Sequence, residues 1–302
     1  MKCFPSRWLA VLLASQTVVF SAHANDQELA LKSMGLLRKA TLALLQEGNA
    51  RYVAGTLKRP NTDAAQRLAT ANEAQEPFAT VLACSDSRVP VELIFDRGIG
   101  EIFTVRVAGN VAHTDEIATI EYGVGHLNTP LVVVMGHTHC GAVTAVVQGA
   151  ELDGLLPQLV ESIKPAVECA RKQGGDEAAI IKNALKANVW QSISDLLRGS
   201  ALVRKQIENG GVSVVGAIYD LETGRVEWLG EHPDQKSILG ACRSETKPIA
   251  GQNPDKLPAP PLQYSNDEPA NNPASPPAPP LHPDYAAVAH HPENDGHESP
   301  AQ

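Results

Sequence analysis

Short apolar runs set between helical patterns are the feature that most constrains the fold of this chain. Residues 131–135 read Leu-Val-Val-Val-Met, with no polar side chain among them. A strand with one face in water would alternate apolar and polar residues, whereas a strand of a parallel sheet is buried on both faces. Such runs, separated by helical periodicity, predict an α/β fold with a mainly parallel central sheet covered by helices on both sides.

Five strands are expected, with helices between them. The predicted strands are residues 78–83, 101–107, 131–135, 211–219 and 225–229. The predicted helical segments are 27–58, 89–95, 115–127, 142–147 and 152–208, the last broken near residues 174–175. The first of these helices precedes every strand.

The first 24 residues are typical of a secretory signal peptide. Lys2 and Arg7 give a positive start, residues 8–20 are largely apolar, and Ala22-His23-Ala24 matches a small-x-small cleavage pattern. The apolar run is too short for a comfortable membrane span. We therefore expect a mature chain that starts at Asn25, is exported to the periplasm or the medium, and has no membrane span.

The other end of the chain is rich in proline. Residues 247–302 include Pro276-Pro277-Ala278-Pro279-Pro280, with Ser, Asn, Ala and acidic residues around such runs. A segment of this composition cannot bury enough apolar surface to offset the entropy of ordering it, so a disordered tail is expected. Residues 25–246 remain, which suits one domain.

Charge and cysteine content narrow the possible partners. The formal net charge is −9, which argues against nucleic acid or an anionic membrane as a partner. Five cysteines are present, and Cys3 would leave with the signal peptide. In an oxidising compartment the remaining four would first be expected in disulfides. Cys84 could pair with Cys140, and Cys169 and Cys242 are expected to be structural thiols or disulfide partners.

Two polar clusters follow directly after predicted strands. They are Cys84-Ser85-Asp86-Ser87-Arg88 and His137-Thr138-His139-Cys140-Gly141. Ligands of open α/β sheets gather beyond the carboxyl ends of the strands, so adjacent strands would bring both clusters into one crevice. Two thiolates and one imidazole form a catalytic type of zinc site, because the fourth tetrahedral position stays open. Spacing alone does not decide between His137 and His139.

The two clusters, extended to residues 84–90 and 136–143, resemble the β-class carbonic anhydrases. Their pattern is C-x-D-x-R, followed roughly fifty residues later by H-x-x-C. Phe103-Thr104-Val105-Arg106-Val107-Ala108-Gly109-Asn110 and Gly48-Asn49-Ala50-Arg51-Tyr52 are also similar to segments of that family. The likeness covers residues 35–232.

This resemblance implies a set of roles. Cys84, His137 and Cys140 would bind one Zn²⁺ per chain, and Asp86 and Arg88 would form the catalytic dyad. The implied reaction is the reversible hydration of carbon dioxide to bicarbonate and a proton, by a zinc-bound hydroxide that the dyad orients. The family also implies a homodimer or tetramer that assembles through an N-terminal helical arm, which in this chain would be the helix from Leu29 to Leu45.

Departures from the family pattern bear on how the zinc site is regulated. Members with Asp as a fourth zinc ligand and a bicarbonate switch carry Trp and Gly where this chain has Val81 and Ala83. We therefore expect an open site without that switch. Arg106 is expected to serve an ion pair at a subunit contact.

Two other functions remain open at this point. One is hydrolysis of carbon disulfide or carbonyl sulfide on the same scaffold. The other is zinc binding without catalysis, which the Asp86–Arg88 pair disfavours, because a storage site needs no dyad.

Overall fold

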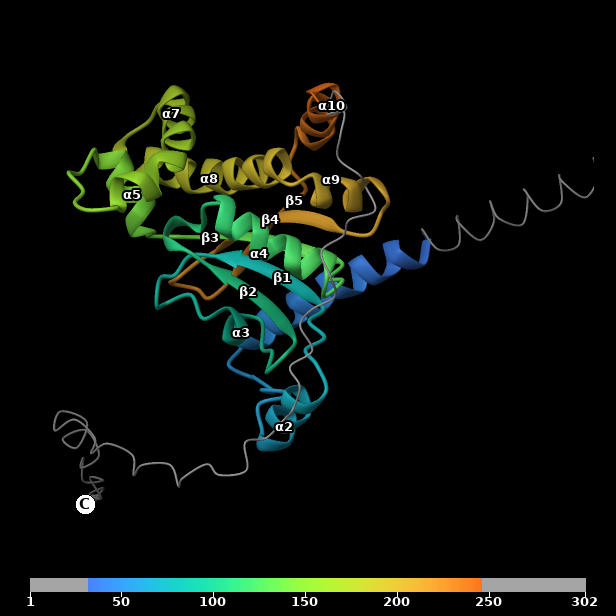
Figure 1. Cartoon of the computed structure of the whole chain (residues 1–302). Helices are drawn as coiled ribbons and strands as arrows, with labels where there is room; N and C mark the ends of the chain where they lie inside the picture. The colour runs from blue at the N-terminus through green and yellow to red at the C-terminus, as the bar shows by residue number, and fades with distance from the viewer. Residues whose placement is uncertain (1–31, 246–302) are drawn as a thin grey trace, which may run out of the picture. The chain divides into compact units, whose positions relative to one another are not determined.

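A five-stranded sheet is the centre of residues 32–245, the part of the chain described by the computed structural model (Figure 1). The strand order is β2-β1-β3-β4-β5, and all neighbours are parallel except β4 and β5. The strands are β1 (Ala79–Ala83), β2 (Ile102–Arg106), β3 (Leu131–His137), β4 (Ser213–Tyr219) and β5 (Val226–Gly230). The predicted mainly parallel sheet is confirmed. The predicted signal peptide and tail lie outside the described residues.

Helices occupy the connections between the strands, as predicted. Residues 32–53 form the N-terminal helix. The others are α2 (Ala64–Asn72), α3 (Val91–Ile94), α4 (Thr114–Gly125), α5 (Gly141–Gln148), α6 (Leu156–Val160), α7 (Lys164–Gln173), α8 (Glu177–Gly199), α9 (Ala201–Glu208) and α10 (Gln235–Glu245). Short 3₁₀ turns cover Ala108–Asn110 and Glu161–Ile163. None of the helices in residues 32–245 has the length and apolar composition to cross a membrane.

Two helices were not predicted, α2 and α10. No residue of α2 is buried, so it has no apolar stripe that would mark it in the sequence. It begins instead with a capping interaction, in which the side chain of Asp63 accepts a hydrogen bond of 2.8 Å from the amide of Gln66.

The apolar run of β3 is buried on both sides, which explains why it carries no alternation. Val132 and Val134 pack in the core against α4 and α8. Val133 and Met135 belong to the core on the other face, which Leu45 of the N-terminal helix completes. Figure 1 shows α4 and α8 on one side of the sheet and the N-terminal helix on the other.

The register of β1 and β3 positions both polar clusters. Ala83, the last residue of β1, pairs with Met135 of β3, and Cys84 follows directly. β3 continues two residues beyond its predicted end, so that His137 is its last residue. The two clusters therefore leave the same edge of the sheet from neighbouring parallel strands, as the sequence predicted.

Candidate metal centre

Three side chains converge beyond β1 and β3. The ligand atoms of Cys84, His137 and Cys140 all lie within 4.8 Å of one another, and all three residues are buried. Tetrahedral zinc with bonds of about 2.0 to 2.3 Å places its ligand atoms roughly 3.5 to 3.8 Å apart, so small adjustments would close the group on an ion. Cys84 and Cys140 are free thiols, and the alternative disulfide between them is not formed.

His137 has the hydrogen bonding expected of a metal ligand. Its ring is fully buried, and Nδ1 lies 2.9 Å from the carbonyl oxygen of Thr138, to which it must donate because that oxygen only accepts. Its Nε2 is buried and has no hydrogen-bond partner among residues 32–245. An imidazole fixed through one nitrogen presents the lone pair of the other to a metal. The residues present therefore fit a bound metal ion.

The structure separates the two candidate histidines, which spacing had left open. The side chain of His139 is 64% exposed, and its Nε2 lies 3.4 Å from Oε1 of Glu222. Its backbone has a positive φ of 56°, which turns the residue away from the strand direction. His139 therefore takes no part in the buried cluster.

The two thiols share one proton. The Cys140 thiol donates to Cys84 and lowers the pKa of Cys84 to about 4; burial opposes this, while the His137 ring and the Gly109 amide assist it. The pKa of Cys140 is raised, because it keeps the shared proton beside an ionised, buried partner. A divalent cation would replace that proton and let both sulfurs ionise.

Cys140 also lies at the start of a helix. It stands at the N-cap of α5, and the amides of Val143 and Ala142 in the first turn act to lower its pKa. Unpaired amides and the positive end of the helix dipole stabilise a thiolate at this position. The local sequence thus supplies part of the electrostatics of the cluster.

Asp86 and Arg88 form a closely matched ion pair. Nε and Nη2 of Arg88 lie 3.0 and 2.8 Å from the two carboxylate oxygens, and the Arg88 amide donates to Oδ1 at 2.9 Å. These contacts with Arg88 hold the pKa of Asp86 well below its ordinary value. Oδ2 of Asp86 also lies 4.0 Å from Nε2 of His137, so the carboxylate faces the buried cluster.

Further contacts support the loop that carries Cys84 and Asp86. Arg106, expected to form an ion pair, donates from Nε to the Cys84 carbonyl at 3.2 Å and from Nη2 to the Asp86 carbonyl at 2.7 Å. The amide of Gly109 donates to Sγ of Cys84 at 3.3 Å. None of these three contacts was predicted, because they join residues 20 to 25 positions apart.

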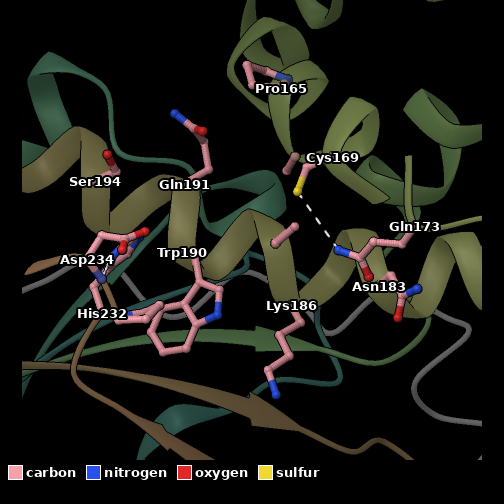
Figure 2. A pocket seen from close by; sticks show the side chains of 13 residues that line it. Pro165, Cys169, Gln173, Asn183, Lys186, Trp190, Gln191, Ser194, His232 and Asp234 are labelled. Carbon is pink, nitrogen blue, oxygen red and sulfur yellow. Dashed lines mark hydrogen bonds between the residues drawn. The ribbon is translucent and has the colours of Figure 1, made fainter. Parts of the chain in front are cut away.

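The remaining two cysteines lie elsewhere. Cys242 is a buried thiol in the core beside α8, and Cys169 is an exposed thiol on α7. Cys169 contributes to a cavity of about 420 Å³, here called the α7–α8 pocket (Figure 2). Its lining residues are Pro165, Ala166, Cys169, Gln173, Asn183, Lys186, Ala187, Trp190, Gln191, Ser194, His232, Pro233 and Asp234. None of the predicted site residues is among them.

Comparison with known proteins agrees with this geometry. The family model described as carbonic anhydrase matches residues 79–226, a range that contains all five predicted site residues. Carbonic anhydrase 2 of Mycobacterium tuberculosis is 37% identical over 186 residues, which cover 60% of this chain and 87% of the relative. The carbonic anhydrase of Mycolicibacterium smegmatis is 36% identical, over 61% of this chain and 89% of the relative.

Solved structures have the same fold. The β-carbonic anhydrase CafA of Aspergillus fumigatus has a TM-score of 0.55 and 29% identity, over 61% of this chain and 89% of that one. A tetrameric β-carbonic anhydrase of Sordaria macrospora has a TM-score of 0.51 and 25% identity, over 55% of this chain and 87% of that one. The fold, the buried cluster of two thiols and an imidazole, and these relatives lead to one conclusion: the chain belongs to the β class of the carbonic anhydrases.

Proposed function

We propose that this enzyme catalyses the zinc-dependent, reversible hydration of carbon dioxide to bicarbonate and a proton. In this proposal Cys84, His137 and Cys140 hold one zinc ion per chain. The observation that carries it is the buried Nε2 of His137, which lacks a partner among residues 32–245 and lies beside two buried thiols. An unsatisfied buried nitrogen costs free energy, and an ion bound between it and the two thiols would remove that cost.

The donor set supports zinc and a catalytic rather than a structural site. Two thiolates and an imidazole favour zinc over magnesium or calcium, which prefer oxygen ligands. A zinc ion held by three protein groups supplies a Lewis acid with one open position, which activates water for attack on an electrophilic carbon. Cys84, His137 and Cys140 would hold that ion beyond the carboxyl ends of β1 and β3.

Asp86 is the group that would orient the attacking water. Its carboxylate faces the metal-ligating group and can accept the hydrogen bond of the nucleophile, which turns an oxygen lone pair toward carbon dioxide. Arg88 holds this carboxylate through both of its oxygens. A bidentate pair of this kind fixes orientation as well as charge.

The same pair bears on the competing arrangement, in which Asp86 is the fourth metal ligand. Movement of Asp86 onto the ion would break its three hydrogen bonds with Arg88. Val81 and Ala83 are buried residues of β1 in the positions where members with the closed state carry Trp and Gly. We therefore propose an open site.

The test combines metal analysis with stopped-flow carbon dioxide hydration. We expect the native chain to bind about one zinc per chain. Asp86→Asn should keep the metal while kcat falls about 10²-fold, because Asn no longer presents a carboxylate to the nucleophile. Asp234→Asn, an exposed carboxylate of the α7–α8 pocket, is the matched control and should change neither quantity.

Two results would contradict the proposal. A folded native chain without metal would exclude the zinc site. A chain that binds zinc but does not hydrate carbon dioxide would favour a zinc-binding protein without catalysis.

We also propose assembly into a dimer or tetramer through the N-terminal helix. Leu36 and Leu37 of this helix are 68% and 55% exposed, which is unusual for a pair of adjacent large apolar residues. The Sordaria macrospora relative is described as tetrameric. Sedimentation of the native chain and of Leu36→Glu tests this, and a native monomer would overturn it.

Export is proposed on the composition of residues 1–24 alone, with the periplasm or the medium as destination. Amino-terminal sequencing of the protein from cells should find Asn25 first. Retention of Met1 would overturn this proposal.

A further inference from the structure

A chain of two hydrogen bonds connects the interior of α8 to a thiol of the metal centre. Nδ2 of Asn188 donates to the carbonyl oxygen of Gly109 at 2.7 Å. The amide of the same glycine donates to Sγ of Cys84 at 3.3 Å. Asn188 is 1% exposed, and 79 residues separate it from Gly109. A buried amide on a helix thus lies one residue away from the thiol without touching it.

Gly109 needs to be held in place for its amide to reach the sulfur. It has φ 77° and ψ 13°, a left-handed conformation within the turn Ala108–Asn110. A Cβ built on it would lie 2.8 Å from Cδ1 of Ile163 and 3.2 Å from Cβ of Ala142, so a larger residue would have to displace these side chains. Glycine itself has the greatest conformational freedom, and a hydrogen bond to its carbonyl is a direct way to restrict it.

As a purely structural residue, Asn188 would lower the stability of the fold. Its Oδ1 is buried and has no hydrogen-bond partner among residues 32–245. An unsatisfied polar atom in the core costs about 1 to 3 kcal/mol. Its neighbours on α8, Leu185 and Val189, are buried apolar residues, and leucine at position 188 would avoid that cost. The hydrogen bond to Gly109 is therefore what the side-chain amide of Asn188 provides and leucine would not.

We propose that Asn188 is a positioning residue of the metal centre, which acts through Gly109 on the sulfur of Cys84. The inference rests on the proposed zinc site. A donor to a thiolate sulfur draws electron density from it and fixes the direction of its lone pairs. Two thiolates make a metal ion a weaker Lewis acid than imidazoles do, and the Gly109 amide partly offsets this. Outer contacts of this kind are worth about 10- to 100-fold in metal affinity or activity.

The test compares Asn188→Leu with Ser192→Ala in the full chain. Ser192 is the matched control, because it is 1% exposed and lies one turn along α8. Its hydroxyl donates to the Asn188 carbonyl at 2.9 Å and not to Gly109. Zinc affinity is measured by competition with a chelator, and sulfur donation by the thiolate-to-metal absorption band of the Co²⁺-loaded chain. We expect zinc binding about 10- to 100-fold weaker and a band at longer wavelength in Asn188→Leu, with Ser192→Ala like the native chain.

A second measurement separates positioning from general loss of structure. In the ¹¹³Cd-loaded native chain, the amide proton of Gly109 should show scalar coupling to the metal across the N–H···S bond. Ser192→Ala should keep this coupling, and Asn188→Leu should weaken it. Asn188→Ala takes the place of Asn188→Leu if leucine prevents folding.

The outcomes are distinguishable from those for the function itself. Native-like affinity, band and coupling in a folded Asn188 variant would overturn the inference and leave the proposed function intact. A native chain that binds no metal would instead reject the proposed function.

Discussion

Two regions of this molecule contain the same kinds of chemically versatile side chain, yet only one is built as a site. The metal centre combines cysteine, histidine and aspartate. The α7–α8 pocket does so too, with Cys169, His232 and Asp234. Within residues 32–245, only Cys84, His137 and Cys140 form a group that could hold a metal. The residue types alone therefore do not define the function.

The difference lies in how the polar atoms are partnered. In the α7–α8 pocket, the amide of Gln173 points at Cys169, while Nδ1 of His232 accepts a hydrogen bond of 3.0 Å from the Asp234 amide (Figure 2). The ring of His232 also packs edge-on against Trp190. These groups satisfy one another or face solvent, whereas the metal centre buries an imidazole nitrogen that has no partner among the described residues. The metal centre therefore differs from the pocket in two respects: its side chains converge, and one of its buried nitrogen atoms has no hydrogen-bond partner among the described residues.

Replacement of one cysteine in each region should give the largest difference between the two regions. In Cys84→Ser, zinc content should fall close to zero and hydration should drop to the uncatalysed rate, because a neutral hydroxyl is a poor substitute for a thiolate ligand. Cys169→Ser should keep the zinc content and the activity of the native chain. Metal analysis and stopped-flow hydration of the two variants decide the matter, and equal loss of zinc in both would show that the α7–α8 pocket takes part in metal binding.

Two carboxylates, Asp96 and Asp195, allow a similar comparison of the free energy of unfolding. Asp96 is buried, which by itself would raise its pKa, but hydrogen bonds from the Lys58 amide and the Arg51 guanidinium prevail and lower it. A lowered pKa stabilises the fold above the unfolded value of about 3.9, and this contribution is lost as pH falls through the folded pKa. Asp96→Asn should reduce the free energy of unfolding at pH 7 by about 3 kcal/mol, because Arg51 loses its partner. Urea titrations at pH 7 and at a pH well below the unfolded value of about 3.9 should show a smaller loss at the lower pH, where the carboxyl group becomes protonated in the folded chain as well.

Asp195 on α8, beside the α7–α8 pocket, should respond with the opposite sign. Burial raises its pKa, and the hydrogen bond from Gln191 only partly compensates. A raised carboxylate pKa means that ionisation opposes folding at neutral pH. Asp195→Asn should therefore leave the free energy of unfolding at pH 7 unchanged or increase it. A loss as large as that of Asp96→Asn would contradict this assignment.

The smallest expected difference within a pair of variants is that between two glycines of similar backbone conformation. Gly109 beside the metal centre and Gly149 at the end of α5 have φ of 77° and 65°. Alanine at 149 meets nothing within 4 Å and should cost about 1 kcal/mol of conformational strain. Alanine at 109 should cost roughly 2 kcal/mol more, because it also collides with Ile163. Chemical denaturation of the metal-free chains measures both, and equal losses would mean that the turn at 109 can open.

Much of the architecture could be predicted because the pattern of apolar residues within a strand indicates which of its faces are buried. The continuous apolar run of β3 predicted a strand covered on both faces, and the positions of Cys84 and Cys140 after strands predicted their convergence. Resemblance to the family singled out His137, which spacing could not. In each case the signal is local.

What could not be predicted depends on contacts between distant residues. The sequence around Asn188 has the pattern of an ordinary amphipathic helix, and nothing nearby indicates that the amide reaches Gly109, 79 residues away. Arg106 likewise contacts carbonyl groups, which every residue possesses and no sequence pattern can reveal. Helix α10 was also missed, since no helix or strand was predicted between residue 229 and the Pro-rich tail that starts at residue 247.

The pairing of Ala83 with Met135 has a consequence for how such a chain can change during evolution. Side chains along a strand alternate between the two layers, so loss of a single residue within β1 or β3 would turn a ligand toward the wrong layer. The surface turns between the two strands, outside β2 and the turn at Gly109, carry no such restriction, and residues can be added there at little energetic expense. Changes of length should therefore be tolerated in those turns, whereas the phase of each strand relative to Cys84 and His137 has to be kept.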